Sequence, residues 1–175
     1  MPSKVPSIAV GAAVSAVLAL LTNVVNATAG QGNQVVGTLV ACLCCLGAVG
    51  CGVIAVYHYT NTHHLTISPG SGAGMGAAAG FLGMIIASIL GYLLQFVGVL
   101  PTAAEALAMA REQMIDAGMP DDQIETALTM TRYMTGPLGI VVSSVVGAIL
   151  GAIGGAIGAA MFKKGGDPML VDDTI

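Results

Sequence analysis

The sequence predicts an all-α integral membrane protein with four membrane-spanning helices. Only 5 basic and 9 acidic residues occur among 175, so 8% of the chain is charged, whereas an ordinary soluble domain carries about 25%. The mean hydropathy is +0.88. A bilayer core of about 30 Å requires roughly 20 apolar residues per helix. Four uncharged stretches are long enough: residues 5–27, 35–57, 73–100 and 138–162.

The same composition excludes several classes of protein. A net charge of −4 provides no basic surface for the phosphates of a nucleic acid. The low charge content also differs from that of soluble enzymes and disordered chains. The alternating polarity that is typical of membrane strands is absent. We therefore expect residues 1–175 to form one helical membrane domain, in contact with lipid and other membrane proteins.

The first predicted span covers residues 5–27. Lys4 precedes the apolar run and small residues follow it at 27–29, a pattern that cleaved signal peptides share. The run is longer than the roughly 7–15 apolar residues of a signal-peptide core. We therefore favour a span that the mature protein keeps.

The second predicted span, residues 35–57, contains all four cysteines. Their spacing matches no zinc site, and in a membrane helix Cys serves as a small apolar residue. We expect this helix to end near Tyr57, which places Tyr57, Tyr59 and Phe162 at one membrane interface, where aromatic side chains anchor helices.

Three histidines, His58, His63 and His64, are expected in a loop over residues 58–72. Imidazole can bind a metal, haem iron or chlorophyll magnesium, so a pigment- or haem-binding subunit is one interpretation. No nearby carboxylate is available to orient the rings, as metal-bound histidines usually require. We favour the alternative, a solvated interfacial loop with no cofactor and no metal.

Small residues recur along one or more faces of the third and fourth predicted spans, residues 73–100 and 138–162. Because lipid supplies no hydrophobic force between helices, such faces let two backbones approach and gain dispersion contacts. They pack either within the bundle or, since the fourth span has small residues on more than one side, against a partner subunit. The glycines concerned are Gly72, Gly76, Gly80, Gly91, Gly147, Gly151, Gly155 and Gly158.

The connection between these spans is expected to form an amphipathic, acidic helical hairpin outside the bilayer, over residues 102–135. Thr102 and Glu105 have the spacing of a capping box, Gly118 ends the first helix, and Pro120 introduces the second. A polar tail covers residues 165–175.

Met130 and Met134 in this hairpin permit a second ligand hypothesis. Thioether sulfur selects Cu(I), and Met130-x3-Met134 followed by Gly147-x3-Gly151 resembles the signature of copper-uptake transporters. Those transporters have three spans and carry the two motifs on separate spans, unlike this chain. We favour methionine as an adaptable apolar contact and keep a soft-metal transporter or channel as the alternative.

No Asp, Glu, Lys or Arg lies within a predicted span. Ion-coupled carriers and proton relays usually place such a group there, so the sequence argues against a pump. No nucleophile–base pair is evident either, and we expect no enzymatic activity. The notable polar residues at depth are Asn23, Gln95, Ser143 and Ser144.

The distribution of Lys and Arg sets the expected orientation. Lys4, Lys163 and Lys164 lie on the side of both termini, whereas Arg111 and Arg132 lie on the other side. The positive-inside rule therefore predicts cytoplasmic N- and C-termini.

Two segments carry a family resemblance. Residues 64–76, HLTISPGSGAGMG, and residues 118–125, GMPDDQIE, resemble a group of small bacterial four-span proteins of unknown function. The resemblance implies a multi-pass protein of the bacterial inner (plasma) membrane, and it implies no activity. With the small-residue faces and the hairpin, it leads us to expect a non-catalytic accessory subunit of a larger membrane complex, such as a respiratory or photosynthetic assembly, or a self-associating protein.

Overall fold

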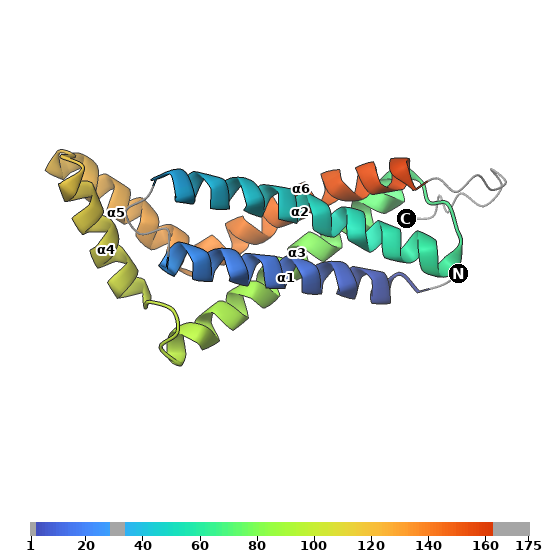
Figure 1. Ribbon diagram of the computed structural model, residues 1–175, viewed down its shortest axis with the longest axis horizontal. Helices are drawn as coiled ribbons and strands as arrows, with labels where there is room; N and C mark the ends of the chain where they lie inside the picture. Colours follow the sequence, from blue (N-terminus) through green and yellow to red (C-terminus); the bar gives the residue numbers. More distant parts are fainter. Residues whose placement is uncertain (1–2, 29–33, 163–175) are drawn as a thin grey trace.

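A computed structural model describes residues 3–28 and 34–162 of the chain (Figure 1). Within these ranges the secondary structure is entirely helical, as the sequence predicts. The predicted tail, residues 165–175, lies outside the described residues. The helices are α1 (Val5–Thr28), α2 (Gln34–His63), α3 (Pro69–Phe96), α4 (Ala103–Asp116), α5 (Asp121–Thr135) and α6 (Pro137–Met161).

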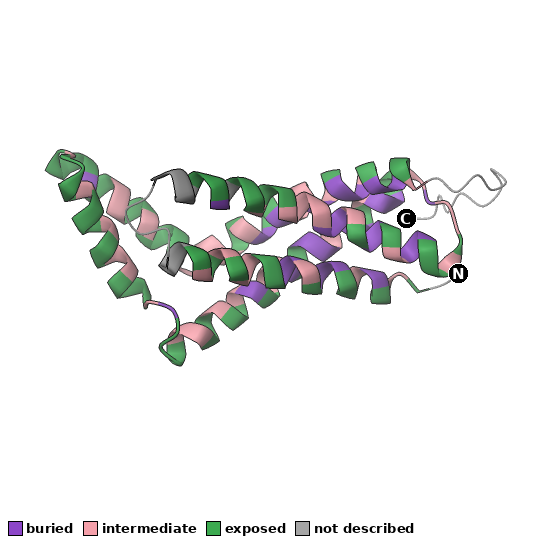
Figure 2. Cartoon of the chain, in the orientation of Figure 1, coloured by how far each residue is buried: buried purple, intermediate pink, exposed green. Residues whose placement is uncertain are grey.

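Four of these helices, α1, α2, α3 and α6, are long and apolar enough to cross a membrane. Only 22–29% of the most apolar part of each is buried within the bundle, so most residues of the spans are at least partly exposed (Figure 2). An outward-facing apolar surface is stable when lipid surrounds it. The chain is therefore a multi-pass membrane protein.

The four spans form a layered bundle in which α2 and α3 occupy the middle. Both helices pack against α1, against α6 and against each other. Within the described residues α1 and α6 make no contact with one another, because they lie on opposite sides of α3. In Figure 1, α3 is tilted across the bundle, so that its C-terminal end diverges from the neighbouring helices.

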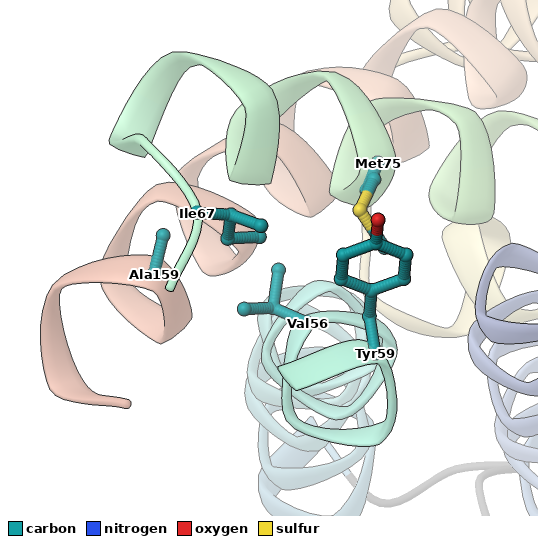
Figure 3. Packing of buried hydrophobic residues seen from close by; sticks show 5 residues of the cluster. All are labelled: Val56, Tyr59, Ile67, Met75 and Ala159. Atoms are coloured by element: carbon teal, nitrogen blue, oxygen red, sulfur yellow. The ribbon is translucent and has the colours of Figure 1, made fainter. Parts of the chain in front are cut away.

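A compact apolar cluster closes the bundle near the C-terminal ends of α2 and α6. Val56 and Tyr59 of α2 lie against Met75 of α3, Ile67 of the preceding loop and Ala159 of α6 (Figure 3). Each of these five side chains is at most 3% exposed. The cluster joins three helices and the α2–α3 connection at one end of the molecule.

The structure extends the second helix beyond its predicted end at Tyr57. α2 continues to His63, so His58 and His63 belong to the helix and the loop predicted over residues 58–72 is wrong in this part. Tyr59 is buried in the core, so its ring is not exposed as the predicted interface anchor would be. The polar sequence after Tyr57 marks the end of the apolar stretch, but it does not end the helix. The helix continues because Tyr59 and Thr60 are buried against the rest of the bundle.

The third helix is displaced relative to its predicted range of residues 73–100. It begins at Pro69, where the Ser68 hydroxyl accepts a hydrogen bond from the Ser71 amide (3.3 Å), and Pro suits the first position of a helix. It ends at Phe96, and Gly98 then adopts a φ of 79°. The glycine-rich run after Pro69 is thus helical, and the loop predicted over residues 58–72 is wrong in this part as well.

The predicted hairpin, residues 102–135, is present as α4 and α5. Thr102 and Glu105 form the expected reciprocal capping box, Gly118 has the left-handed φ of 71° that ends a helix, and Pro120 precedes α5. The hairpin projects from the end of the bundle opposite to the N-terminus (Figure 1). It connects to the spans at Leu100 and at Gly136.

Candidate interaction surfaces and an intramembrane cavity

The backbones of α3 and α6 meet along matched rows of glycines. A Cβ atom added to Gly76 would strike the carbonyl oxygen of Gly151, and a Cβ on Gly80 would strike that of Gly147. A Cβ on Gly72 would lie 2.6 Å from the carbonyl oxygen of Gly155. Only glycine permits this separation, at which the main chains themselves supply the dispersion contacts that hold helices together in lipid.

A second face of α6 packs on α2 in the same way. A Cβ on Gly154 would collide with the backbone of Val49, and a Cβ on Gly158 would lie 3.1 Å from the Cα atom of Val53. Gly52 of α2 has no room for a side chain against α6 either. The small residues on two sides of α6 therefore serve two neighbours within this chain.

Seven of the eight glycines singled out from the sequence lie at these contacts, and Gly91 does not. A Cβ on Gly91 would meet no atom within 4 Å, because α3 has by then diverged from α6. Gly91 instead lines a cavity of about 320 Å³. The sequence contains no signal for this cavity, since it results from the tilt of α3.

The cavity lies at the hairpin end of the bundle, between α1, α3 and α6. It forms there because the described parts of α1 and α6 do not contact each other. Met84 lies at its inner end, where its Cγ atom covers Gly147 at the last glycine contact. Ala103 and Ala106 of α4 line it from the hairpin. The cavity is thus bounded by three spans, by the first turn of α4 and by the last turn of α5.

Four hydroxyl groups line this cavity, and each already donates a hydrogen bond to a main-chain oxygen. Ser88 donates to Met84 (2.8 Å), Ser143 to Ile140 (3.0 Å) and Thr135 to Thr131 (2.8 Å). Tyr92 reaches across from α3 to the carbonyl of Thr135 (3.4 Å). This last contact joins the diverging end of α3 to the junction between α5 and α6.

Two amide side chains, those of Asn23 and Gln95, complete the polar lining. Neither amide has a hydrogen-bond partner among the described residues; Asn23 is exposed and Gln95 is half-buried. Asn23 lies near the C-terminal end of α1 and Gln95 near that of α3, so both face the hairpin end of the cavity. Among the residues lining the cavity none is acidic, basic or histidine.

The hairpin contributes little to the core of its own chain. Among the described helices α4 contacts only α5, and α4 buries no side chain at all. Ile124 is the one buried residue of α5. Apolar side chains remain exposed on both helices: Met109, Ile115, Met130, Tyr133 and Met134.

Met130 and Met134 lie one turn apart on α5 and have different surroundings. Met130 is 65% exposed and does not line the cavity, whereas Met134 is 48% exposed and does line it. The glycines that follow them in the proposed copper signature, Gly147 and Gly151, are covered by α3. The two motifs therefore do not converge on a common site.

The three histidines have separate environments. The Nδ1 atom of His58 lies 3.0 Å from the Ser7 hydroxyl, so this ring links α2 to α1. His63 packs edge-on against Tyr59, with ring centroids 4.9 Å apart, and His64 is exposed after the end of α2. Within the described residues, no three His, Cys, Asp or Glu side chains come together as a set that could hold a metal ion.

Outside the spans, the carboxyl group of Glu105 has a perturbed pKa. The backbone N–H of Thr102 donates to Oε2 of Glu105 (2.8 Å), and the Thr102 hydroxyl donates to the same oxygen (2.8 Å). These hydrogen bonds favour the carboxylate and hold the pKa of Glu105 below its ordinary value. The group is structural, since it caps the helix that begins the hairpin.

Comparison with known proteins identifies a family without an assigned activity. No curated protein and no solved structure matches the chain. The model of DUF4199, described as a protein of unknown function, matches residues 8–164. This match covers most of α1 and all of the later helices, in agreement with the resemblance in the sequence. The chain belongs to the DUF4199 family.

Proposed function

We propose that this protein is a non-catalytic accessory subunit of a larger membrane complex and that it docks through the hairpin formed by α4 and α5. The observation that carries the proposal is that α4 buries no side chain in its own chain. A helix with a complete capping box that adds nothing to the core is best explained by contacts made with another molecule.

The composition of the exposed hairpin surface supports a protein partner. Met130 and Tyr133 are 65% and 62% exposed and lie three residues apart on α5, so they share a face. Tyr and Met are enriched at protein interfaces, and methionine adapts to an uneven partner surface. We infer that this face contacts an apolar surface on another subunit.

The glycine faces restrict where a partner can dock, because they are occupied within the chain. The rows on α3 and α6 hold the bundle itself together, so they are not available to a partner. A bacterial inner membrane with both termini in the cytoplasm is the setting that we propose, and it places the hairpin on the opposite side. A respiratory or photosynthetic assembly would be a complex of this kind.

Photocrosslinking in native membranes tests the proposed docking surface. A photoreactive phenylalanine analogue is placed at Met130 in one variant and, as the control, at Val145 of α6 in another. Val145 is 48% exposed and lies in a span, where lipid is its expected neighbour. We expect an adduct of protein mass at position 130 and none at position 145.

Two results would count against the proposal. If position 130 yields only lipid adducts, the exposed face of α5 lies on the bilayer surface. If both positions yield the same protein adduct, the partner covers the spans and the hairpin has no special role.

A further inference from the structure

The cavity at the hairpin end of the bundle has features of a binding site, and these are independent of the docking surface. It is an open pocket, several of whose lining residues are exposed, and at about 320 Å³ it exceeds an engineered enclosed apolar cavity of about 150 Å³ that binds benzene. It lies within the size range of small-molecule sites, from about 300 Å³ upward. A small ligand therefore fits between α1, α3 and α6.

The lining defines which chemistry such a ligand would have. Ala19, Met84, Ala87 and Ile140 provide an apolar wall. Since no acidic, basic or histidine side chain lines the cavity, a charged ligand would lose its hydration without gaining a counter-charge. The site thus favours an uncharged molecule with an apolar body.

The two amides define one end of the ligand. The lining hydroxyls donate to main-chain oxygens, whereas the Asn23 and Gln95 amides have no hydrogen-bond partner among the described residues. Each amide offers two donors and one acceptor. A ligand with one hydroxyl or carbonyl group at the hairpin end would satisfy part of this capacity.

We propose that this cavity binds a small uncharged amphiphile, with its apolar body toward Met84 and its hydroxyl or carbonyl group toward Gln95 and Asn23. The proposal does not depend on the accessory-subunit function. It assigns a binding role to Gly91, because the missing side chain at this position leaves the space that the ligand would occupy.

Gly91 also provides a way to fill the site. A Cβ at Gly91 meets no atom within 4 Å, so Gly91→Leu adds bulk at an open position of the cavity wall. Gly74 of the same helix is equally open but does not line the cavity. Gly74→Leu is therefore a matched control for the added bulk and for the better helix propensity of Leu.

The experiment uses benzyl alcohol as the probe and thermal unfolding of the full chain in detergent as the readout. A ligand that binds only the folded state stabilises it in a saturable way. We expect a saturable rise in Tm for the unaltered protein and for Gly74→Leu, and none for Gly91→Leu. Toluene, without a hydroxyl, should bind more weakly, and benzoate, with a charge, should give no saturable rise.

A second variant removes the polar contact and keeps the volume. Gln95→Met should weaken the apparent affinity for benzyl alcohol by about 2- to 10-fold, the effect of one hydrogen bond. This variant tests the proposal even if Gly91→Leu fails to fold. If the probe only partitions into detergent, the Tm of all four proteins should change alike and without saturation. That result would overturn the proposal.

Discussion

Gly76 shows what individual glycines contribute to this bundle. Its Cα faces the backbone of Gly151, and the position has no room for a Cβ atom. The atom that would collide is a carbonyl oxygen of another helix, which cannot move aside as a flexible side chain can. The consequence of a substitution here is a separation of two helices along their whole contact.

Gly76→Ala should therefore destabilise the bundle by about 2 kcal/mol or more, within or above the usual range for overpacking. Gly74→Ala is the control, because a Cβ at Gly74 meets nothing within 4 Å and Ala is the better helix former. Reversible unfolding in mixed micelles measures both. Equal stability of the two variants would mean that α3 and α6 do not meet at Gly76.

His64 is a residue whose backbone conformation conflicts with its side chain. It follows α2 with a φ of 53°, where a Cβ atom costs roughly 1–2 kcal/mol. His64→Gly should be more stable than His64→Ala by about 1 kcal/mol, because both remove the imidazole and only one removes the Cβ. The same unfolding assay measures the difference, and a more stable alanine variant would contradict the left-handed conformation.

At the scale of the element, α4 depends on its cap more than the other helices do, since it has no buried face. The folded-state pKa of Glu105 is lowered, so the carboxylate contributes fully above the pKa it has in the unfolded chain. The contribution disappears as the pH falls through the lowered folded-state pKa. We expect the first turn of α4 to open in acid while the spans remain folded.

Hydrogen exchange of the Glu105 and Ala106 amides measures this opening. In Glu105→Gln the side chain still accepts from Thr102 but does not titrate, so the variant serves as the reference at each pH. In acid, these amides should exchange faster in the unaltered protein than in Glu105→Gln, so the ratio of the two rates should rise as the pH falls. A ratio that stays constant with pH would show that the cap does not control the turn.

The sequence determines these elements to different degrees. The starts and ends of α4 and α5 could be predicted, because their signals are local: a capping box at Thr102, a left-handed Gly118 and a proline at position 120. The end of α2 could not, because the burial of Tyr59 depends on Ile67 and Met75 from other segments. Hydropathy marks the extent of the apolar stretch, which is shorter than the helix.

The candidate sites follow the same division. Glycine spacing predicts that close contacts exist, and the structure pairs α3 with α6 and α6 with α2. The choice between partners within the chain and outside it requires the tertiary arrangement. The cavity was not predictable, because residues as distant as Asn23, Gln95 and Ser143 meet only through the tilt of α3.

At the scale of the whole molecule, the two kinds of small and apolar surface have different roles. The glycine faces close the bundle, and the exposed residues on the outside of the spans (Figure 2) include many large apolar ones, for which lipid is the expected neighbour. The hairpin lies beyond the end of the spans. Its exposed apolar side chains are explained neither by packing in the bundle nor by the lipid around the spans. This division is the basis for placing the partner at the hairpin.

The mass of the gently solubilised native particle tests this account most directly. The chain weighs 17.3 kDa, and we predict a larger particle whose mass is not an integer multiple of this value. Met130→Glu should release the free chain. Thr129→Glu, which introduces the same charge at an exposed polar neighbour, should not. Isolation of the unaltered protein as a lone 17.3 kDa chain, or as copies of itself only, would contradict the account.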